Sequence, residues 1–187
     1  CFMGISTDSY TVSLGSDGPF TGAVNFLGYP MFFKERCVHK VFGRYPASFQ
    51  IQDTPCRGVQ AGCHGSLAIV GETLFYKARS GICAFDGSLP VEVSQALGSE
   101  TYSHAVGGAV GSKYYVSMEN AAGSWNLFVY DTARGMWHRE DGLHAAALCA
   151  CKGELYCIDG ENKNIITLIV NQHLVILMHP PVLCLLF

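Results

Sequence analysis

A repeat of about 40 residues constrains the fold of this chain more than any other feature. The four copies of its first segment occupy residues 21–28, 64–71, 104–111 and 144–151. Three copies begin with a histidine, namely His64, His104 and His144, at intervals of 40 residues, whereas the first copy has Thr21 at that position. Repetition at this interval is typical of proteins built from stacked copies of one supersecondary unit.

Each copy is predicted to contain four short strands. The first segment ends in a turn glycine and a second apolar run follows it; the glycines are Gly28, Gly71, Gly111 and Gly153. Glycine suits such turns because it adopts positive φ at little cost. A third run ends in an aromatic residue before a turn, and a fourth short run completes the unit. The runs are rich in β-branched and aromatic residues, as strands are.

Four strands in a period of about 40–45 residues are the signature of a β-propeller blade. A β-sandwich also uses short, evenly spaced strands, but it has no reason to repeat its sequence at this interval. The sequence therefore predicts an all-β propeller of about four blades, each with four antiparallel strands. Both a closed four-bladed ring and an open fragment of a larger ring fit this pattern. The abrupt start of the chain favours the open fragment.

The ends of the chain depart from the repeat. Residues 1–19 are interpreted as the remnant of a preceding blade and a loop, and residues 20–168 as the blades. Residues 169–187 form an atypical apolar tail, and we hypothesise that this tail is not native sequence. Its polar residues and a Pro-Pro pair interrupt the roughly 20 apolar residues that a transmembrane helix needs. No membrane span is therefore expected.

Composition excludes some classes of function. Only 14% of the residues are charged, and the net charge of −3 leaves no footprint for nucleic acid or an anionic membrane. There are 9 cysteines and no C-x-x-C pair. They are interpreted as reduced, buried small apolar residues of an intracellular protein, with no secretory signal before them.

No catalytic, cofactor-binding or metal-binding motif stands out, so we expect no enzyme activity, no cofactor and no metal. The chain lacks a G-x-S-x-G elbow, an H-E-x-x-H pair and a P-loop. The acidic residues that glycosidase chemistry would need are expected at turns, where Asp commonly lies. The four that define this expectation are Asp53, Asp86, Asp131 and Asp159.

One group of residues is a weak candidate for an interaction site at a rim of the predicted ring. Its members are His64, Tyr102, His104, Trp125 and His144. The three histidines are expected where the inner strands begin, where they would either bind a ligand or metal or cap strand edges through backbone hydrogen bonds. Capping is favoured, because Thr21 replaces the histidine in the first copy.

Tyr130 and Trp137 resemble the aromatic pair of the kelch repeat, which packs between neighbouring blades. Asp131 follows Tyr130, and the first unit holds Phe42 and Phe49 at the same spacing. The chain departs from the kelch pattern in its Gly-Gly pair, which lies inside an apolar strand rather than after it. These aromatic residues are expected to be core rather than a ligand site.

Three segments resemble propeller proteins encoded in the structural gene clusters of phages and prophages. They are residues 74–90, with an Asp-Gly-Ser-Leu-Pro turn, residues 113–117 and residues 127–141. The resemblance extends over residues 20 to about 160, and includes proteins at the head–tail junction of short-tailed phages. It implies a virion or tail component and a longer parent protein, and it assigns no site residues.

Two functions stay open. In the first, the chain is a non-enzymatic structural protein of a phage or prophage particle, found in the virion or bacterial cytoplasm. Its partners would be other virion subunits or further copies of itself, docked on exposed blade edges. In the second, it is a soluble propeller module that binds a peptide or carbohydrate at one rim of the ring. The fold alone does not choose between them.

Overall fold

The computed structural model describes residues 14–45, 48–140 and 142–168, and the regular secondary structure in this part of the chain is almost wholly β-strand. The first sheet contains β1 (Gly22–Phe26), β2 (Tyr29–Phe33), β3 (Cys37–Phe42) and β4 (Gln50–Pro55). The second contains β5 (Ala68–Val70), β6 (Thr73–Lys77), β7 (Ile82–Phe85) and β8 (Val91–Glu92). The third contains β9 (Tyr102–Val110), β10 (Lys113–Asn120), β11 (Trp125–Asp131) and β12 (Met136–Arg139). The fourth contains β13 (Ala145–Cys151), β14 (Glu154–Asp159) and β15 (Ile165–Leu168).

Every sheet has the same connectivity. Its strands follow one another in sequence order, and each pairs antiparallel with the next. The prediction of repeated antiparallel units is therefore confirmed, with three strands in the fourth sheet of the described chain. Short 3₁₀ helices precede the second and third sheets, η3 (His64–Ser66) and η4 (Gln95–Leu97). In the described residues no helix has the length and apolarity needed to cross a membrane.

The tight turns between the first two strands of each sheet are of two kinds. Leu27 and Gly28 both have positive φ, 52° and 79°, and Lys152 and Gly153 repeat this pattern. In the second and third sheets the glycine stands first in the turn. The turn glycines are therefore not structurally equivalent. Counted from the first residue of each turn, Met31 of β2 corresponds to Phe75 of β6. Aligning Gly28 with Gly71 would instead make Met31 correspond to Leu74, one residue earlier.

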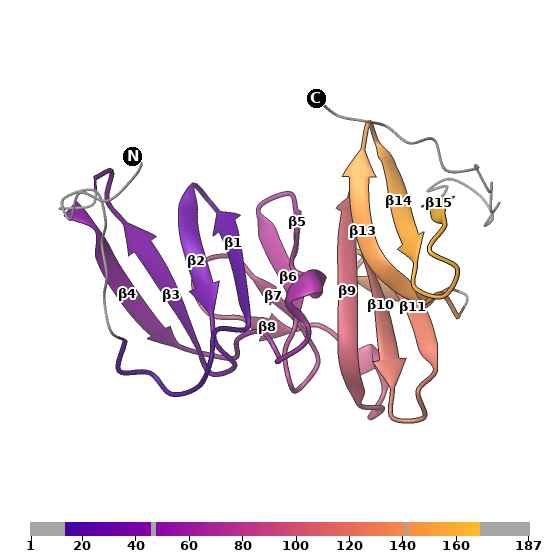
Figure 1. Ribbon diagram of the computed structural model, residues 1–187, viewed down its shortest axis with the longest axis horizontal. Coiled ribbons are helices and arrows are strands. Elements are labelled where there is room, and N and C mark those ends of the chain that lie inside the picture. Colours follow the sequence, from indigo (N-terminus) through magenta and orange to yellow (C-terminus); the bar gives the residue numbers. More distant parts are fainter. Residues whose placement is uncertain (1–13, 46–47, 141, 169–187) are drawn as a thin grey trace.

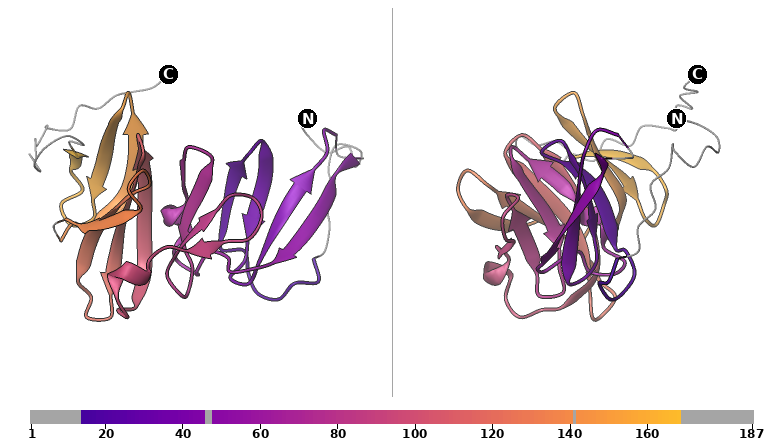
Figure 2. Two further views of the ribbon diagram at one scale, coloured as in Figure 1. Left: turned by 180° about the vertical axis from the view of Figure 1, so that it is seen from behind. Right: turned by 90° about the vertical axis from the view of Figure 1, so that its left-hand side faces the viewer.

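The four sheets stack face to face in a row, as Figure 1 and the left panel of Figure 2 show. The first sheet and the fourth sheet lie at opposite ends, so the described residues do not close into a ring. The first strand of the third sheet, β9, lies beside both β5 and β13. Seen along the row, the sheets overlap one another (Figure 2, right).

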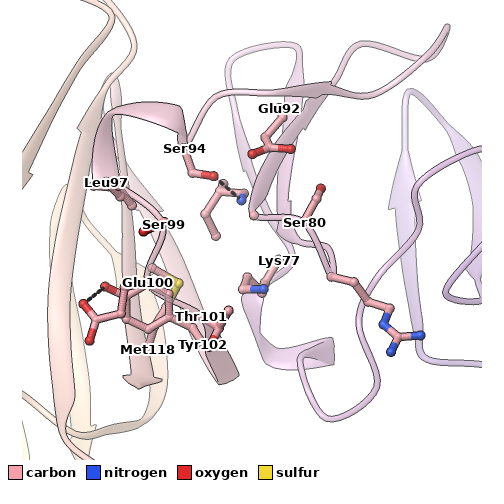
Figure 3. A pocket seen from close by; sticks show the side chains of 14 residues that line it. Lys77, Ser80, Glu92, Ser94, Leu97, Ser99, Glu100, Thr101, Tyr102 and Met118 are labelled. Atoms are coloured by element: carbon pink, nitrogen blue, oxygen red, sulfur yellow. Dashed lines mark hydrogen bonds between the residues drawn. The ribbon is translucent and has the colours of Figure 1, made fainter. Parts of the chain in front are cut away.

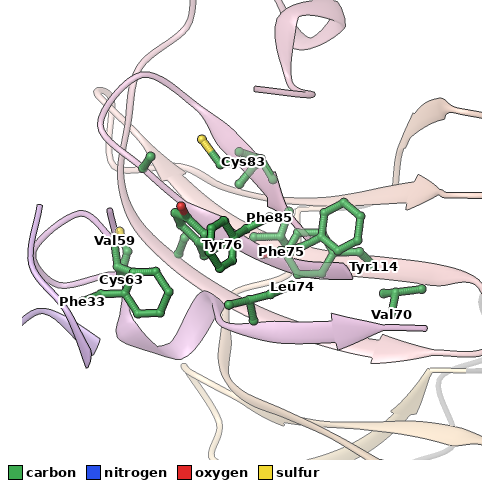
Figure 4. Close-up of a cluster of buried hydrophobic side chains, with 14 of the residues drawn as sticks. Phe33, Val59, Cys63, Val70, Leu74, Phe75, Tyr76, Cys83, Phe85 and Tyr114 are labelled. Carbon is green, nitrogen blue, oxygen red and sulfur yellow. The ribbon is translucent and has the colours of Figure 1, made fainter. Parts of the chain in front are cut away.

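Two apolar cores hold the row together. The larger joins the first three sheets, and Figure 4 shows part of it, with Phe33 against Tyr76 and Phe75 stacked on Tyr114. The smaller joins the third and fourth sheets through residues such as Tyr115 and Leu155. Buried aromatic rings supply much of the apolar surface removed from water at these junctions.

Gly107 and Gly108 allow β9 to be packed closely on both faces. A Cβ atom at Gly107 would lie 2.7 Å from the Ser66 carbonyl oxygen, beside the second sheet. A Cβ atom at Gly108 would lie 2.8 Å from Cβ of Leu148, in the fourth sheet. Consecutive residues of a strand point to opposite faces, so two adjacent glycines serve two junctions.

Several local expectations can be compared with the fold. Asp86, Asp131 and Asp159 accept hydrogen bonds from backbone N–H groups just after them, as turn residues do. Asp53 was expected at a turn, and this was wrong: it lies inside β4 and pairs with a residue of β3. Cysteines of the second and fourth sheets, such as Cys83 and Cys157, are buried as expected, but Cys149 and Cys151 are exposed. The interpretation of residues 1–13 and 169–187 concerns parts of the chain outside the described residues.

Candidate functional site

Three of the five predicted rim residues gather at one end of the third sheet. His104 of β9 and Trp125 of β11 are both paired with Glu119 of β10, so the three side chains share one face. The Nδ1 atom of His104 lies 2.7 Å from a carboxylate oxygen of Glu119. This face is the one that is turned toward the fourth sheet.

His144, which directly precedes β13, completes the group. Its ring stacks on Trp125 with 4.0 Å between ring centroids and 15° between ring planes. On its other side the imidazole lies against the backbone of Gly160, where a Cβ atom would be 2.5 Å from ring atoms. The Trp125–His144 stack is therefore held between the third sheet and a loop of the fourth. We call His104, Glu119, Trp125 and His144 the rim group.

Tyr102 and His64 do not belong to the rim group. Tyr102 is buried, packs edge-on against Phe128, and donates its hydroxyl hydrogen bond to Glu100. Phe128 belongs to the core on the opposite face of the third sheet, so Tyr102 points away from Trp125. His64 lies in η3, ahead of the second sheet, where its carbonyl accepts a hydrogen bond from Leu67.

The rim group places the stacked rings of Trp125 and His144 beside an acidic and basic pair. The indole and imidazole planes are parallel, and the exposed His104–Glu119 pair can both donate and accept hydrogen bonds. Such a combination suits flat polar ligands. No group of three or more metal-ligating side chains occurs in the residues that the structure describes.

A second polar group was missed by the sequence analysis and centres on His39 of β3. Its Nδ1 atom lies 2.5 Å from the Asp53 carboxylate, which is the acceptor for an N–H at that position. Its Nε2 atom then accepts from the Ser16 hydroxyl at 3.1 Å, with the Cys37 sulfur 3.3 Å away. A nucleophile, an imidazole and a carboxylate in this order also occur in hydrolases.

Burial argues against catalysis at His39. The imidazole is 1% exposed and Cys37 is 7% exposed, so both groups are shielded from solvent, although Ser16 is half-buried. Lys34 donates a hydrogen bond to the Ser16 carbonyl at 2.5 Å and lies over the ring of Phe20. The His39 group is therefore a clasp that holds residues 14–20 on the outer face of the first sheet. The signal in the sequence was the Cys-x-His pair of one strand, which alone did not reveal the distant Asp53.

Comparison with known proteins adds no family to this description. No protein-family model matches the chain. No curated protein sequence matches it significantly.

Proposed function

We propose that the chain is a run of β-propeller blades that acts as a non-enzymatic scaffold and docks a second copy of itself on its last sheet. The propeller assignment is supported by the sequential antiparallel sheets and by their face-to-face stacking. The first strand of the third sheet lies beside the first strands of the second and fourth sheets, as inner strands around a propeller axis do.

The docking proposal depends on one comparison: the outward face of the fourth sheet corresponds to the faces that the first three sheets bury against their neighbours. In β2, β6 and β10 the side chains pointing to the next sheet include Met31, Phe75 and Tyr115, all buried. Tyr156 of β14 occupies the same position in the fourth sheet. It lies on a face that the described residues leave open, and it is only half-buried.

The rest of this open face is mostly apolar, although the register also places Glu154 and Thr167 on it. Ile158 and Ile165 are cross-strand partners and are 41% and 53% exposed. Cys149 and Cys151 of β13 lie on the same face. We call Cys149, Cys151, Tyr156, Ile158 and Ile165 the end face. A face of this composition favours removal from water by another apolar sheet, as at the three existing junctions.

The occupant that fits is the end face of a second copy, related by a two-fold axis. Head-to-tail stacking would need the outer face of the first sheet, but residues 14–20 are clasped there by His39 and Lys34. A self-complementary interface needs no other surface, and it closes after two copies rather than growing into a filament. The scaffold is therefore proposed to be a dimer.

Sedimentation velocity tests the dimer with matched variants. The unmodified chain should sediment as a dimer at about 100 µM, a concentration that populates micromolar complexes. Ile158→Lys and Ile165→Lys should be monomeric, because each buries an unpaired ammonium in the interface. Leu89→Lys is the control, because Leu89 is 62% exposed in a loop of the second sheet and should leave the dimer intact. A monomeric unmodified chain, or a control that also dissociates, would contradict the proposal.

We also propose that the scaffold is a component of a phage or prophage particle. The resemblance of residues 20 to about 160 to phage structural propeller proteins supports this. Mass spectrometry of purified particles from a host that carries the gene provides the test. Peptides of this chain should be present in stoichiometric amounts with other structural proteins. Particles that lack them would remove the virion role but leave the dimer untouched.

The rim group supports a second candidate function, binding of a carbohydrate or peptide. The observation that favours it is the Trp125–His144 stack beside the His104–Glu119 pair. Sugar rings pack on aromatic planes while their hydroxyl groups bond to neighbouring polar side chains. A glycan array should show a hit that Trp125→Ala removes and His64→Ala retains. An array with no hit would leave the scaffold as the supported function.

A further inference from the structure

A cleft with a volume of about 100 Å³ opens where the second and third sheets meet. Figure 3 shows its lining, in which Lys77 of β6 faces Glu100, Tyr102 and Met118 from the third unit. The loop that carries Ser94 and Ser99 forms another wall. Pockets for drug-sized ligands have volumes of roughly 300–1,000 Å³, so this cleft suits only a very small molecule.

Lys77 is an unusual residue for its position. The matching side chains of the first and third sheets, Phe33 and Ser117, are uncharged and completely buried. Lys77 is only 3% exposed, yet it carries an ammonium group. Burial lowers the pKa of this group, because the interior disfavours its charged form. An ammonium held in such a place normally has a partner of opposite charge.

Lys77 has no carboxylate partner within ion-pair distance among the described residues. Its ammonium donates to the side-chain oxygen of Gln60 at 2.8 Å and to the carbonyl oxygen of Ala78 at 2.6 Å. These two neutral acceptors use two of the three N–H donors of a lysine. The third donor and the positive charge remain for a group in the cleft.

The other charged groups of the cleft are already engaged. Arg79 pairs with Glu35 at 3.6 Å, and Glu92 pairs with Arg57 at 3.2 Å. Glu100 accepts hydrogen bonds from Tyr102 at 2.9 Å and from Asn120 at 2.8 Å. The two glutamate carboxylates make the cleft unfavourable for a ligand with several negative charges, such as a phosphate. A ligand with a single negative charge is repelled less by these carboxylates and is attracted by the ammonium of Lys77.

We propose that this cleft binds a small molecule that bears a single carboxylate group, with one carboxylate oxygen on the ammonium of Lys77. A charge-assisted hydrogen bond of this kind is stronger than one between neutral groups. The hydroxyl groups of Ser99 and Thr101, also in the lining, can donate further hydrogen bonds. This inference is independent of the proposed dimer, because the cleft lies between the second and third sheets and not on the end face.

The methyl group of Met118 is a local reporter for the experiment, because Met118 lines the cleft and is almost fully buried. Its NMR signal can be followed in the full chain with ¹³C-methyl-labelled methionine, and Met118→Leu assigns it. Acetate and propionate are the probes, acetamide is the neutral probe of similar shape, and sodium chloride keeps ionic strength constant. Acetate has few atoms, so binding in the millimolar range is expected.

The expected result is a saturable shift of the Met118 signal with acetate and propionate, and none with acetamide. Lys77→Met should weaken this binding at least about tenfold, because it removes the one cation of the lining that has no ion-pair partner. Met136, which is exposed on β12, supplies the control signal and should not shift. The unmodified chain alone can overturn the proposal: an unmoved Met118 signal, or equal shifts with acetamide or inorganic phosphate, would contradict it.

Discussion

The indole N–H of Trp137 donates a hydrogen bond to the carbonyl oxygen of Val93 at 2.7 Å, and so ties the third sheet to the second. The ring also packs on Tyr130, with 4.9 Å between centroids, and Tyr130 packs on Phe75 of β6. Trp137 therefore combines an apolar contact, which has little directional preference, with a polar contact that fixes the register of the two sheets.

Replacing Trp137 by Phe should lower the free energy of unfolding by about 1–3 kcal/mol, because the ring is largely kept while the Val93 carbonyl loses its donor. Urea denaturation measures the change. The matched control is Trp125→Phe, since the ring of Trp125 is stacked on His144 and a phenyl ring can keep part of that contact. Equal losses for both variants would argue against a special role for the Trp137 hydrogen bond.

Gly108→Ala should destabilise the chain by about 1–3 kcal/mol, the usual cost of overpacking a close junction. The added methyl group would meet Cβ of Leu148 at 2.8 Å, an atom that no side-chain rotation can move away, and Cδ1 of Leu155 at 3.0 Å. Gly15→Ala is the control, because a Cβ atom there has nothing within 4 Å. Thermal unfolding of both variants provides the measurement. A Gly108→Ala protein as stable as the control would show that the third and fourth sheets pack more loosely than described.

Asp53→Ala should weaken the clasp on residues 14–20, because it leaves Nδ1 of the buried His39 without its acceptor. A loss of about 1–3 kcal/mol is expected for an unpaired polar group in such a place. Limited proteolysis should also cleave the Asp53→Ala chain faster near residues 14–20. Asp17→Ala, at an exposed residue of the same segment, is the control. Unchanged cleavage in Asp53→Ala would mean that Lys34 alone holds the segment.

Stability should fall as the pH rises from about 9 to about 11. Burial raises the pKa of four thiols from 9.0 to about 11, namely Cys56, Cys63, Cys83 and Cys157. The folded chain therefore keeps protons that the unfolded chain loses in this interval, and unfolding is favoured as the pH rises. Lys77, whose pKa is lowered, acts in the opposite direction up to 10.5, but it is one group against four.

Urea denaturation at about pH 8 and about pH 10.5, under reducing conditions, measures this pH dependence. The chain with Cys63→Ala and Cys83→Ala should lose less stability between the two conditions than the unmodified chain does. An equal loss in both proteins would show that other groups, such as the buried phenols of Tyr76 and Tyr114, dominate the alkaline response.

Cys149 and Cys151 should report directly on the proposed dimer through their reaction with a thiol reagent. In the monomeric Ile158→Lys chain they should react fast, because both are exposed on β13. In the unmodified chain their reaction should slow as protein concentration rises, because the second copy covers them. Cys63 and Cys83 are buried in the core and should react slowly in both. A rate for Cys149 and Cys151 that is independent of concentration would contradict the dimer.

The strand pattern could be predicted from the sequence because it depends on local composition. Alternating apolar residues and turn glycines placed the four units correctly, including the strands that became β6 and β10. The register between units could not be derived in the same way. Gly28 stands second in its turn and Gly71 stands first, although both have positive φ, and only the strand pairing separates these cases.

The candidate sites likewise depend partly on local sequence and partly on how the sheets pack against one another. Trp125 and His144 lie 19 positions apart in the chain, and their stacking depends on how the third and fourth sheets meet. Sequence analysis placed both near one rim, but it included Tyr102, which turns to the core. Lys77 and Asp53 were missed for a related reason. Each looked ordinary in its own segment, and only the neighbouring strand or sheet makes its charge significant.

The separation of the apolar interior into two cores has a consequence for how the chain loses structure. The core shared by the third and fourth sheets is the smaller one, and among the described residues the fourth sheet is packed on one side only. In arrays whose units touch only their neighbours, stability is a sum of local contributions. In the monomeric Ile158→Lys chain, amide protons of β13–β15 should therefore exchange with deuterium through partial openings of that end, while those of β6 and β10 should exchange only when the whole array unfolds.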